Sequence, residues 1–243
     1  MASPNRVYPT RRFQGVGGAS AERRVAGVDY LDGGGLDDAL SRWLDAVADV
    51  DRAGRPAGDP AHAALVVLDL QAFFCDPASH AHLPAARHVL PRVATLARAF
   101  RDAGSPVIFT RHALAEGEDP GRMGDWWGDV VREGQPRAAL WPAAGALPGD
   151  PVLRKTTYDA FAGTGLAARL ADAGITSVVL AGVMTHLCVE TTARAAFLRG
   201  LFVQVAADGT ASADEALHVG ALRSLAHGFA RVRSCRALAR WCR

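Results

Sequence analysis

The sequence predicts an α/β fold: a Rossmann-like, three-layer αβα arrangement around a six-stranded parallel sheet. From residue 61 onward, short and unbroken apolar segments alternate with segments of helical pattern. Strands that are apolar on both sides are buried on both faces, and their alternation with helices is typical of a parallel sheet. The chain has 243 residues, of which 49% are hydrophobic, so it is long enough to form one such domain and its core.

The individual elements follow from this alternation. Gly104, Gly174 and Gly200 each come directly after a helical segment, and glycine at that position commonly ends a helix. The expected strands are 63–69, 106–110, 152–155, 177–182, 201–206 and 229–232. The expected helices between them are 82–103, 164–173, 185–199 and 213–227.

Residues 1–60 are predicted to form an N-terminal extension, and residues 61–243 the main domain. The extension contains one amphipathic helix, at about 36–50, whose apolar residues recur at helical spacing. The segment 52–60 contains two prolines and two glycines and is interpreted as a linker. We expect the helix to pack on the main domain or at a subunit interface. Its apolar residues are Leu36, Leu40, Trp43, Leu44, Val47 and Val50.

Composition excludes several classes of function. The net charge of +2 is too small to predict binding to nucleic acid or to an anionic membrane. No run of 18 apolar residues is present to span a bilayer, and no apolar signal segment follows the first residues, so we expect a cytoplasmic protein. The four cysteines form no C-x-x-C pair and are expected to be free thiols.

Three reactive side chains lie where predicted strands end. Asp69 ends the first strand, Lys155 ends the third, and Cys188 lies just beyond the fourth. Ligands of parallel sheets bind outside the carboxyl ends of the strands, so the three side chains are expected to converge on one crevice. Lys155 is also the only lysine among 27 basic residues. Either one lysine codon survived by chance, or this position needs a compact ammonium that a guanidinium cannot replace.

The surroundings of Cys188 favour a reactive thiol. Thr185 is a suitable N-cap for the helix that follows, which would place Cys188 in the first helical turn. There the helix dipole and a nearby Lys155 ammonium would lower the pKa of the thiol. Asp69 can take the thiol proton and return it to a leaving amine. Alternatively, Cys188 is a structural residue that packs against the sheet.

These residues lie in motifs that resemble those of the isochorismatase-like cysteine hydrolases. That superfamily includes nicotinamidases, N-carbamoylsarcosine amidases and ureidoacrylate amidohydrolases. Asp69 and Gln71 form a D-x-Q motif, and an aromatic-rich segment follows Lys155. Cys188 lies in the motif G-V-M-T-H-L-C-V, residues 182–189. The resemblance in order and spacing covers roughly residues 61–233 and leaves out the extension.

The resemblance implies a cysteine-dependent amidohydrolase in which Asp69, Lys155 and Cys188 form a catalytic triad and a thioester forms on Cys188. It also implies a cis peptide bond before Met184, which directs the backbone N–H groups of Met184 and Cys188 into one oxyanion hole. The implied partner is a small molecule with a linear amide, ureido or carbamoyl C–N bond. No cofactor is expected, and the resemblance implies a homo-oligomer.

Two departures from family patterns bear on the substrate. Nicotinamidases have a metal-binding Asp-x-His after the second strand, but this chain has Thr110, Arg111 and His112 there. His112 alone is a poor metal site, so no metal is expected and nicotinamide is not the favoured substrate. True isochorismatases lack the cysteine at the position of Cys188, and its presence favours covalent amide hydrolysis.

The walls of the substrate pocket are predicted from residues near the triad in sequence. Trp126 and Trp127 lie in a glycine-rich segment where a lid is expected, whereas Phe73 and Phe161 are expected in the core. His80 is expected on a surface loop, and His186 either supports the site or faces solvent. The full set of substrate-binding candidates is Gln71, Phe74, His112, Trp126, Trp127, Tyr158 and Thr185.

Three rival interpretations remain open. The first is a non-covalent, isochorismatase-type hydrolysis of a vinyl ether that depends on Asp69. The second is a catalytically silent binding subunit of the same fold. The third keeps the amidohydrolase reaction but uses Cys75 as its nucleophile, although Cys75 lacks a helix N-terminus signal.

Overall fold

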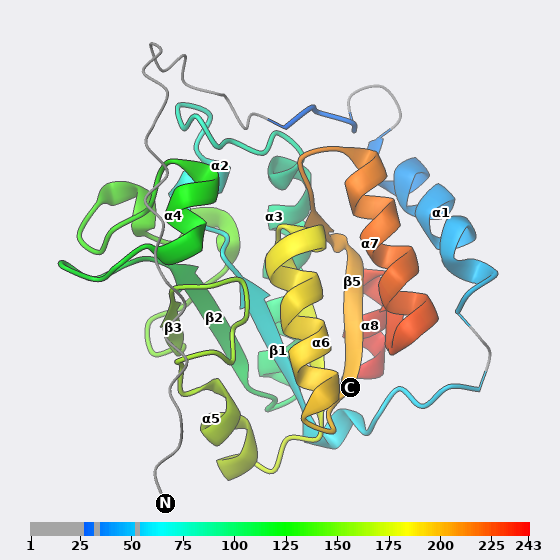
Figure 1. The fold of residues 1–243 in the computed structure, drawn as a ribbon. Coiled ribbons are helices and arrows are strands. Elements are labelled where there is room, and N and C mark those ends of the chain that lie inside the picture. The colour runs from blue at the N-terminus through cyan, green and yellow to red at the C-terminus, as the bar shows by residue number, and fades with distance from the viewer. Residues whose placement is uncertain (1–26, 32–34, 52–53) are drawn as a thin grey trace, which may run out of the picture.

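The computed structural model describes residues 27–31, 35–51 and 54–243, which fold around one six-stranded sheet (Figure 1). The strands are β1 (Ala63–Leu68), β2 (Val107–His112), β3 (Val152–Lys155), β4 (Ser177–Val183), β5 (Phe202–Ala211) and β6 (Ala230–Arg233). All neighbouring strands are parallel, in the order β3-β2-β1-β4-β5-β6. The predicted α/β fold class with a six-stranded parallel sheet is confirmed.

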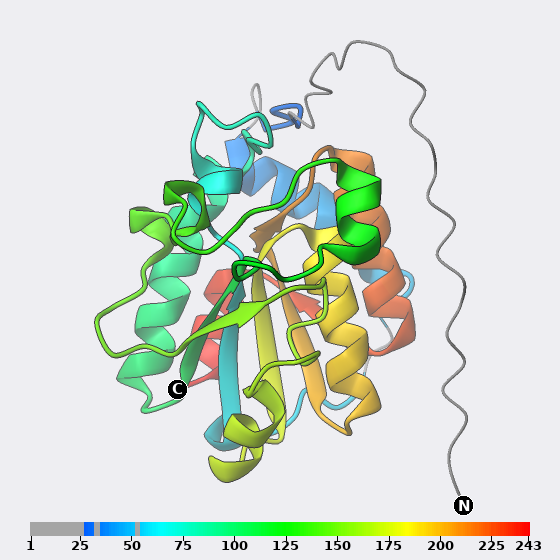
Figure 2. The ribbon, with the colours of Figure 1, turned by 60° about the vertical axis from the view of Figure 1, so that its left-hand side comes forward.

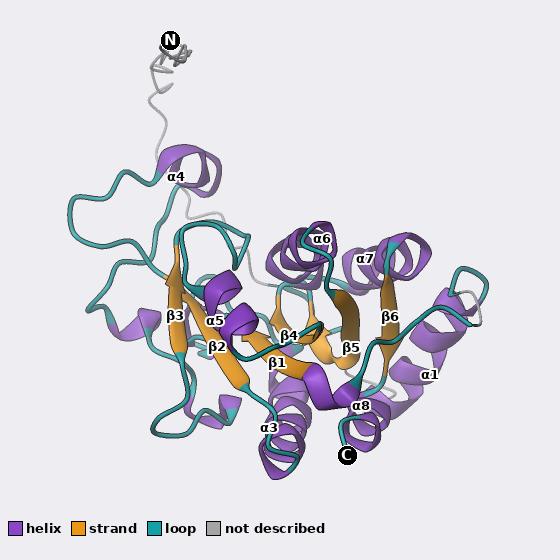
Figure 3. Ribbon diagram, turned by 90° about the horizontal axis from the view of Figure 1, so that it is seen from below, coloured by secondary structure: helices purple, strands orange, loops and turns teal. Residues whose placement is uncertain are grey.

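Helices cover both faces of the sheet. They are α1 (Gly35–Ala48), α2 (Ala72–Cys75), α3 (Ala86–Asp102), α4 (Gly121–Trp127), α5 (Leu166–Asp172), α6 (Glu190–Leu198), α7 (Glu215–Gly228) and α8 (Cys235–Trp241). Helices α5, α6 and α7 lie on one face and α3 and α8 on the other, as Figure 3 shows. No helix in the described part of the chain has the length and apolar character needed to cross a bilayer.

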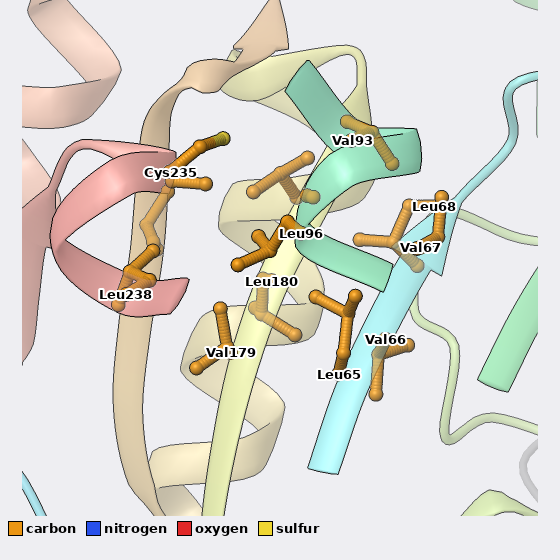
Figure 4. Close-up of a cluster of buried hydrophobic side chains, with 14 of the residues drawn as sticks. Leu65, Val66, Val67, Leu68, Val93, Leu96, Val179, Leu180, Cys235 and Leu238 are labelled. Atoms are coloured by element: carbon orange, nitrogen blue, oxygen red, sulfur yellow. The ribbon is translucent and has the colours of Figure 1, made fainter. Parts of the chain in front are cut away.

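The core lies between the sheet and its two helical layers. Every residue of the two central strands β1 and β4 is buried. On the face covered by α3 and α8, the strand side chains pack against Val93, Leu96 and Leu238 (Figure 4). Burying one such apolar side chain contributes about 1.5–3 kcal/mol relative to leaving it exposed. The sheet is therefore a rigid platform for the residues that follow its strands.

The amphipathic helix expected at about 36–50 is α1. Its residues Leu36, Trp43 and Val47 are buried in the same core as the sheet, and α1 packs against α7 (Figure 1) near the β6 edge (Figure 3). Arg223 of α7 also pairs with Asp49, which follows α1. Helix α1 therefore packs on the main domain, which is one of the two roles expected for it. Residues 1–26 of the predicted extension lie outside the described residues, and the domain division itself stays a prediction.

The fifth strand is longer than its sequence pattern indicates. Asp208, Gly209 and Thr210 are unfavourable in strands, but β5 continues through them to Ala211 after an irregular register with β4. The Asp208 carboxylate accepts a hydrogen bond from the backbone N–H of Cys235 at 2.5 Å. Asp208 is thus accommodated by a tertiary contact, which a strand pattern does not reveal.

Three helices were not predicted: α2, which has four residues, α4 and α8. Helix α8 begins after Ser234, whose hydroxyl accepts from the backbone N–H of Ala237 at 3.1 Å. Its buried residues Cys235 and Leu238, and the buried Cys242 directly after it, have helical spacing, a signal that the sequence does contain. Helix α4 has no buried residues, and therefore no hydrophobic periodicity could reveal it.

Gly182 allows a close approach of the two central strands below the site. Its φ of 108° is rarely adopted by residues with side chains, and a Cβ here would lie 2.0 Å from the carbonyl oxygen of Leu68. A side chain at this position would push β1 and β4 apart. Because Asp69 follows β1 and Cys188 follows β4, this glycine keeps the two residues close.

Candidate active site

The three reactive residues predicted from the strand ends lie together at the carboxyl edge of the sheet. Lys155 Nζ lies 2.7 Å from Asp69 Oδ2 and 3.3 Å from Cys188 Sγ. Their exposed fractions are 0% for Asp69, 1% for Lys155 and 6% for Cys188. Helix α4 and the connection from β1 to α3 lie beyond this edge (Figure 2). The expected convergence of the three side chains on one place is thus observed.

Asp69 leaves β1 with its carboxylate held by two partners. It has a φ of 51°, and it is the one residue other than glycine with a positive φ in the described part of the chain. Such a conformation costs on the order of 1–3 kcal/mol and persists where the surroundings enforce it. Thr110 on β2 donates its hydroxyl to Asp69 Oδ1 at 2.7 Å, and Lys155 lies against Oδ2. The orientation of the carboxylate is therefore fixed.

Lys155 carries a charge inside the protein. Its Nζ also donates a hydrogen bond to the carbonyl of Thr157 at 2.9 Å. Burial by itself lowers the pKa of an ammonium group, but the adjacent Asp69 and Cys188 outweigh burial and raise the pKa of Lys155 to about 12. The ammonium is therefore protonated near neutral pH and compensates the charge of Asp69.

The turn that carries Cys188 differs from the helix N-terminus that the sequence predicts. Residues Thr185–Val189 form one π-helical turn before α6, and Met184 rather than Thr185 occupies the N-cap position. The Thr185 hydroxyl lies 2.8 Å from His218 Nδ1, so this side chain binds a neighbouring helix instead of capping its own. Single π turns of this kind occur frequently at functional sites.

The pKa of the Cys188 thiol also departs from the expectation. Burial raises this pKa to about 12, Lys155 opposes the rise, and the Asp69 carboxylate adds to it. The predicted lowering by Lys155 is thus present, but burial is the larger effect. Cys188 is a neutral thiol in this arrangement, so any reaction of its sulfur as a nucleophile would need a base to remove the proton.

The peptide bond between Val183 and Met184 is cis, as the resemblance implies. Met184 and Cys188 both line one cavity, which is described in the next paragraph. The residues that would form the oxyanion hole therefore lie beside each other at the cavity wall. The hole itself stays a prediction.

A cavity of about 80 Å³ lies next to Cys188. Four of the seven substrate-binding candidates line it: Phe74, His112, Trp127 and Tyr158. The indole N–H of Trp127 donates to the Tyr158 hydroxyl at 2.7 Å, which joins α4 to the segment after β3. The aromatic wall expected around the triad is therefore present for these residues.

Gln71, Trp126 and Thr185 do not line this cavity. Gln71 is fully buried, and its side-chain amide bonds both the N–H and the carbonyl of His112 at 2.7 and 3.0 Å. It thereby joins the end of β1 to the end of β2. Trp126 is 80% exposed, because adjacent residues of a helix point in different directions and Trp127 takes the inner one.

Two residues that were not among the substrate-binding candidates, His80 and Phe73, also line the cavity. His80, expected on a surface loop, lines it with its Nε2 3.2 Å from Asp129 Oδ2. Phe73, expected in the core, is half-buried and also lines it. Arg137 donates to both oxygens of Asp129, at 2.5 and 2.9 Å. His80 and Asp129 lie in irregular segments whose path no periodicity encodes, and the His-Ala-His at residues 80–82 was the one available signal.

His112 presents an uncharged imidazole to the cavity. Burial, together with the nearby Lys155 charge, lowers its pKa to about 4. Among the described residues its Nδ1 is buried without a hydrogen-bond partner. A buried polar atom is normally paired, so this nitrogen is free to bind a polar group of a ligand.

Cys75, the rival nucleophile, does not line the cavity, and burial raises the pKa of its thiol to about 12. In the part of the chain that the structure describes, no three His, Cys, Asp or Glu side chains are grouped so as to hold a metal ion.

The sequence of this chain matches one family model and several known proteins. The family model for the isochorismatase domain matches residues 63–237. Nicotinamidase 3 from Arabidopsis thaliana is 39% identical over 181 residues, which cover 73% of this chain and 87% of that protein. Ureidoacrylate amidohydrolase RutB from Methylobacterium radiotolerans is 31% identical over 191 residues, which cover 69% of this chain and 74% of that protein.

A solved structure of an amidase is also similar to this chain in fold and sequence. N-carbamoylsarcosine amidase from Thermoplasma acidophilum matches with a TM-score of 0.63 and 27% identity, over 71% of this chain and 96% of that chain.

Proposed function

The chain belongs to the isochorismatase family, and on that premise we propose that it is an amidohydrolase that cleaves a small-molecule amide C–N bond through a thioester on Cys188. The observation that carries the proposal is the enclosed cluster of Asp69, Lys155 and Cys188 at the end of a cavity. Relatives named nicotinamidase and ureidoacrylate amidohydrolase support the reaction class.

Formation of the thioester needs a base beside a neutral thiol. Asp69 takes the Sγ proton as Cys188 attacks the substrate carbonyl, which forms the C–S bond and places negative charge on the carbonyl oxygen. Backbone N–H groups of Met184 and Cys188 hold that oxygen in the proposed oxyanion hole. Asp69 then gives the proton to the leaving nitrogen, the C–N bond breaks, and ammonia or an amine departs.

Hydrolysis of the thioester uses the same groups, with water in place of the thiol as the nucleophile. Asp69 removes a proton from water, the hydroxide attacks the carbonyl carbon, and the C–S bond breaks. The Cys188 sulfur regains a proton from Asp69, and a carboxylic acid leaves. Lys155 keeps its charge throughout and balances the negative charge that moves between the carboxylate and the sulfur.

The lining of the cavity supports an uncharged, planar substrate. None of the described lining residues is a lysine or an arginine: Lys155 belongs to the cluster at the end of the cavity, and Arg137 donates two hydrogen bonds to Asp129. A substrate carboxylate would therefore find no lysine or arginine among the described lining residues, and burying a charge without a cationic partner is costly. Phe74, Trp127 and Tyr158 instead offer flat apolar surface.

A heteroaromatic carboxamide is thus a candidate alongside linear amides and carbamoyl compounds. The missing Asp-x-His argues against nicotinamide only if the metal is essential to the reaction. A relative that is 39% identical is named a nicotinamidase, which favours including this substrate class. The polar Nδ1 of His112 offers one hydrogen-bonding partner for a ring nitrogen or an amide.

A substrate panel tests the proposal. Ammonia release is measured with nicotinamide, a linear aliphatic amide, N-carbamoylsarcosine and ureidoacrylate, with wild type and Cys188→Ala. We expect release from the uncharged amides, weaker release from the carboxylates, and none from Cys188→Ala. Equal turnover by wild type and Cys188→Ala would favour the non-covalent alternative. A folded wild type that hydrolyses no amide would favour a silent binding subunit.

A further inference from the structure

The N-terminal segment contacts residues that are bonded to the turn that carries Cys188, although this segment lies outside the residues that match the family domain. That match begins at residue 63, whereas Tyr30 and Trp43 precede it. Trp43 is 1% exposed, and its indole N–H donates to Glu215 Oε1 at 2.8 Å. This bond ties α1 to the first turn of α7, which in turn packs against the π turn Thr185–Val189.

His218 on α7 links Trp43 to the turn. The imidazole is fully buried, and the Trp43 ring meets it edge-to-face with centroids 4.3 Å apart. Tyr30 lies against the same imidazole at 6.2 Å. His218 Nδ1 lies 2.8 Å from the hydroxyl of Thr185, the first residue of the turn. Burial lowers the pKa of His218 to about 3, so the ring is a neutral hydrogen-bonding group at ordinary pH.

A second connection reaches the next residue of the turn. The Tyr30 hydroxyl accepts a hydrogen bond from the backbone N–H of Ser212 at 3.3 Å. The Ser212 hydroxyl lies 2.9 Å from Nδ1 of His186, which is half-buried. His186 is therefore part of this support. The first two residues of the turn are each bonded to a group that the N-terminal segment contacts.

We propose that Tyr30 and Trp43 are positioning residues for the turn that carries Cys188, and that they act through Ser212 and His218. No side chain caps this turn from within, so its start is fixed by contacts from outside. Cys188 is three residues beyond Thr185, and its sulfur must keep its place relative to Lys155 and Asp69. Displacing a reacting group by about 1 Å can cost ~100-fold in rate.

The test compares Trp43→Ala with Leu36→Ala. Leu36 is buried on the same helix, so its replacement also loosens α1 but keeps the aromatic contact with His218. Both variants are measured where circular dichroism shows them to be folded. For Trp43→Ala we expect kcat to fall about tenfold or more with little change in KM. Trp43→Phe should retain most of the wild-type kcat, and Leu36→Ala should keep kcat within about twofold of wild type. Equal losses of kcat in Trp43→Ala and Leu36→Ala would overturn the proposal.

The kcat comparison rests on the proposed function, because it needs an amide that the protein hydrolyses. A second measurement does not depend on that function. Backbone hydrogen exchange is followed by mass spectrometry in a peptide covering residues 184–190 and in one covering β1. We expect Trp43→Ala to accelerate exchange in the first peptide and leave the second unchanged, whether or not an amide is hydrolysed. Unchanged exchange at 184–190 would refute the positioning role. In a Thr185→Val background, Trp43→Ala should cause little further acceleration, and full additivity would contradict the route through His218.

Discussion

Replacing Lys155 with arginine tests whether the lone lysine is a compact charge that the site requires. The side chain is completely buried, and Nζ contacts the Asp69 carboxylate, the Cys188 sulfur and the Thr157 carbonyl at 2.7, 3.3 and 2.9 Å. A guanidinium is wider, planar and carries its donors in a fixed fork. It keeps the charge that Asp69 needs, but it cannot meet all three partners at these distances.

The structure sets the expected magnitudes. Extra volume in a closed site typically costs about 1–3 kcal/mol of folding free energy, which for a chain of this size lowers the thermal midpoint by about 2–12 °C. The protein should therefore still fold. A displacement of about 1 Å in the cationic group predicts a loss of ~100-fold in kcat. Because Lys155 opposes the rise in the Cys188 pKa, the pKa of this thiol should rise further when the charge is displaced.

The assay uses one preparation for thermal midpoint, kcat and the pH dependence of Cys188 alkylation, read by peptide mass spectrometry. Arg154→Lys is the matched control, because Arg154 precedes Lys155 on β3 and pairs with Glu118 at the surface. We expect the control to retain kcat. Wild-type kcat and an unshifted alkylation profile in Lys155→Arg would refute the reasoning and make the lone lysine an accident of codon usage.

Three further predictions follow from other parts of the structure. Burial lowers the pKa of His218 in the folded state to about 3, so at mildly acidic pH the unfolded chain binds a proton that the folded chain does not. The free energy of unfolding, measured by urea titration, should therefore fall by about 2–3 kcal/mol between pH 7 and 4.5. The fall should be smaller in His218→Gln. Gly182→Ala should yield little soluble protein, because its Cβ would collide with the β1 backbone; soluble expression with wild-type stability would contradict the close approach. Trp127→Ala should raise KM more than Trp126→Ala does, since Trp127 lines the cavity; equal effects in steady-state kinetics would disagree with that placement.

The sequence predicts the parts of the fold that hydrophobic pattern controls. The apolar segments that form β1 and β4 predict buried parallel strands, and the residues following them predict where Asp69 and Cys188 lie. The predictions for β1 and β4 hold because a buried strand is specified locally, by its own run of apolar side chains. Lys155 was also predicted at the end of β3, although that strand is only partly buried.

Features that depend on tertiary contacts could not be predicted in this way. The cavity wall from His80 and Asp129 comes from irregular segments that meet only in the folded chain. The pKa of Cys188 was expected to be lowered, because a sequence reveals charged neighbours but not the depth of burial, which is the larger effect here. The bond from Thr185 to His218 likewise replaces a local cap with a distant partner.

The central claim is that Cys188 forms a covalent acyl intermediate, and mass spectrometry of the quenched reaction tests it most directly. An amide that the enzyme turns over is mixed with it, quenched in acid within one turnover, and the peptide containing Cys188 is analysed. The account predicts a transient mass increase equal to the acyl group on Cys188, present in wild type, with no adduct and no turnover in Cys188→Ala. Rapid turnover with no adduct on Cys188, together with an active Cys188→Ala, would contradict the claim.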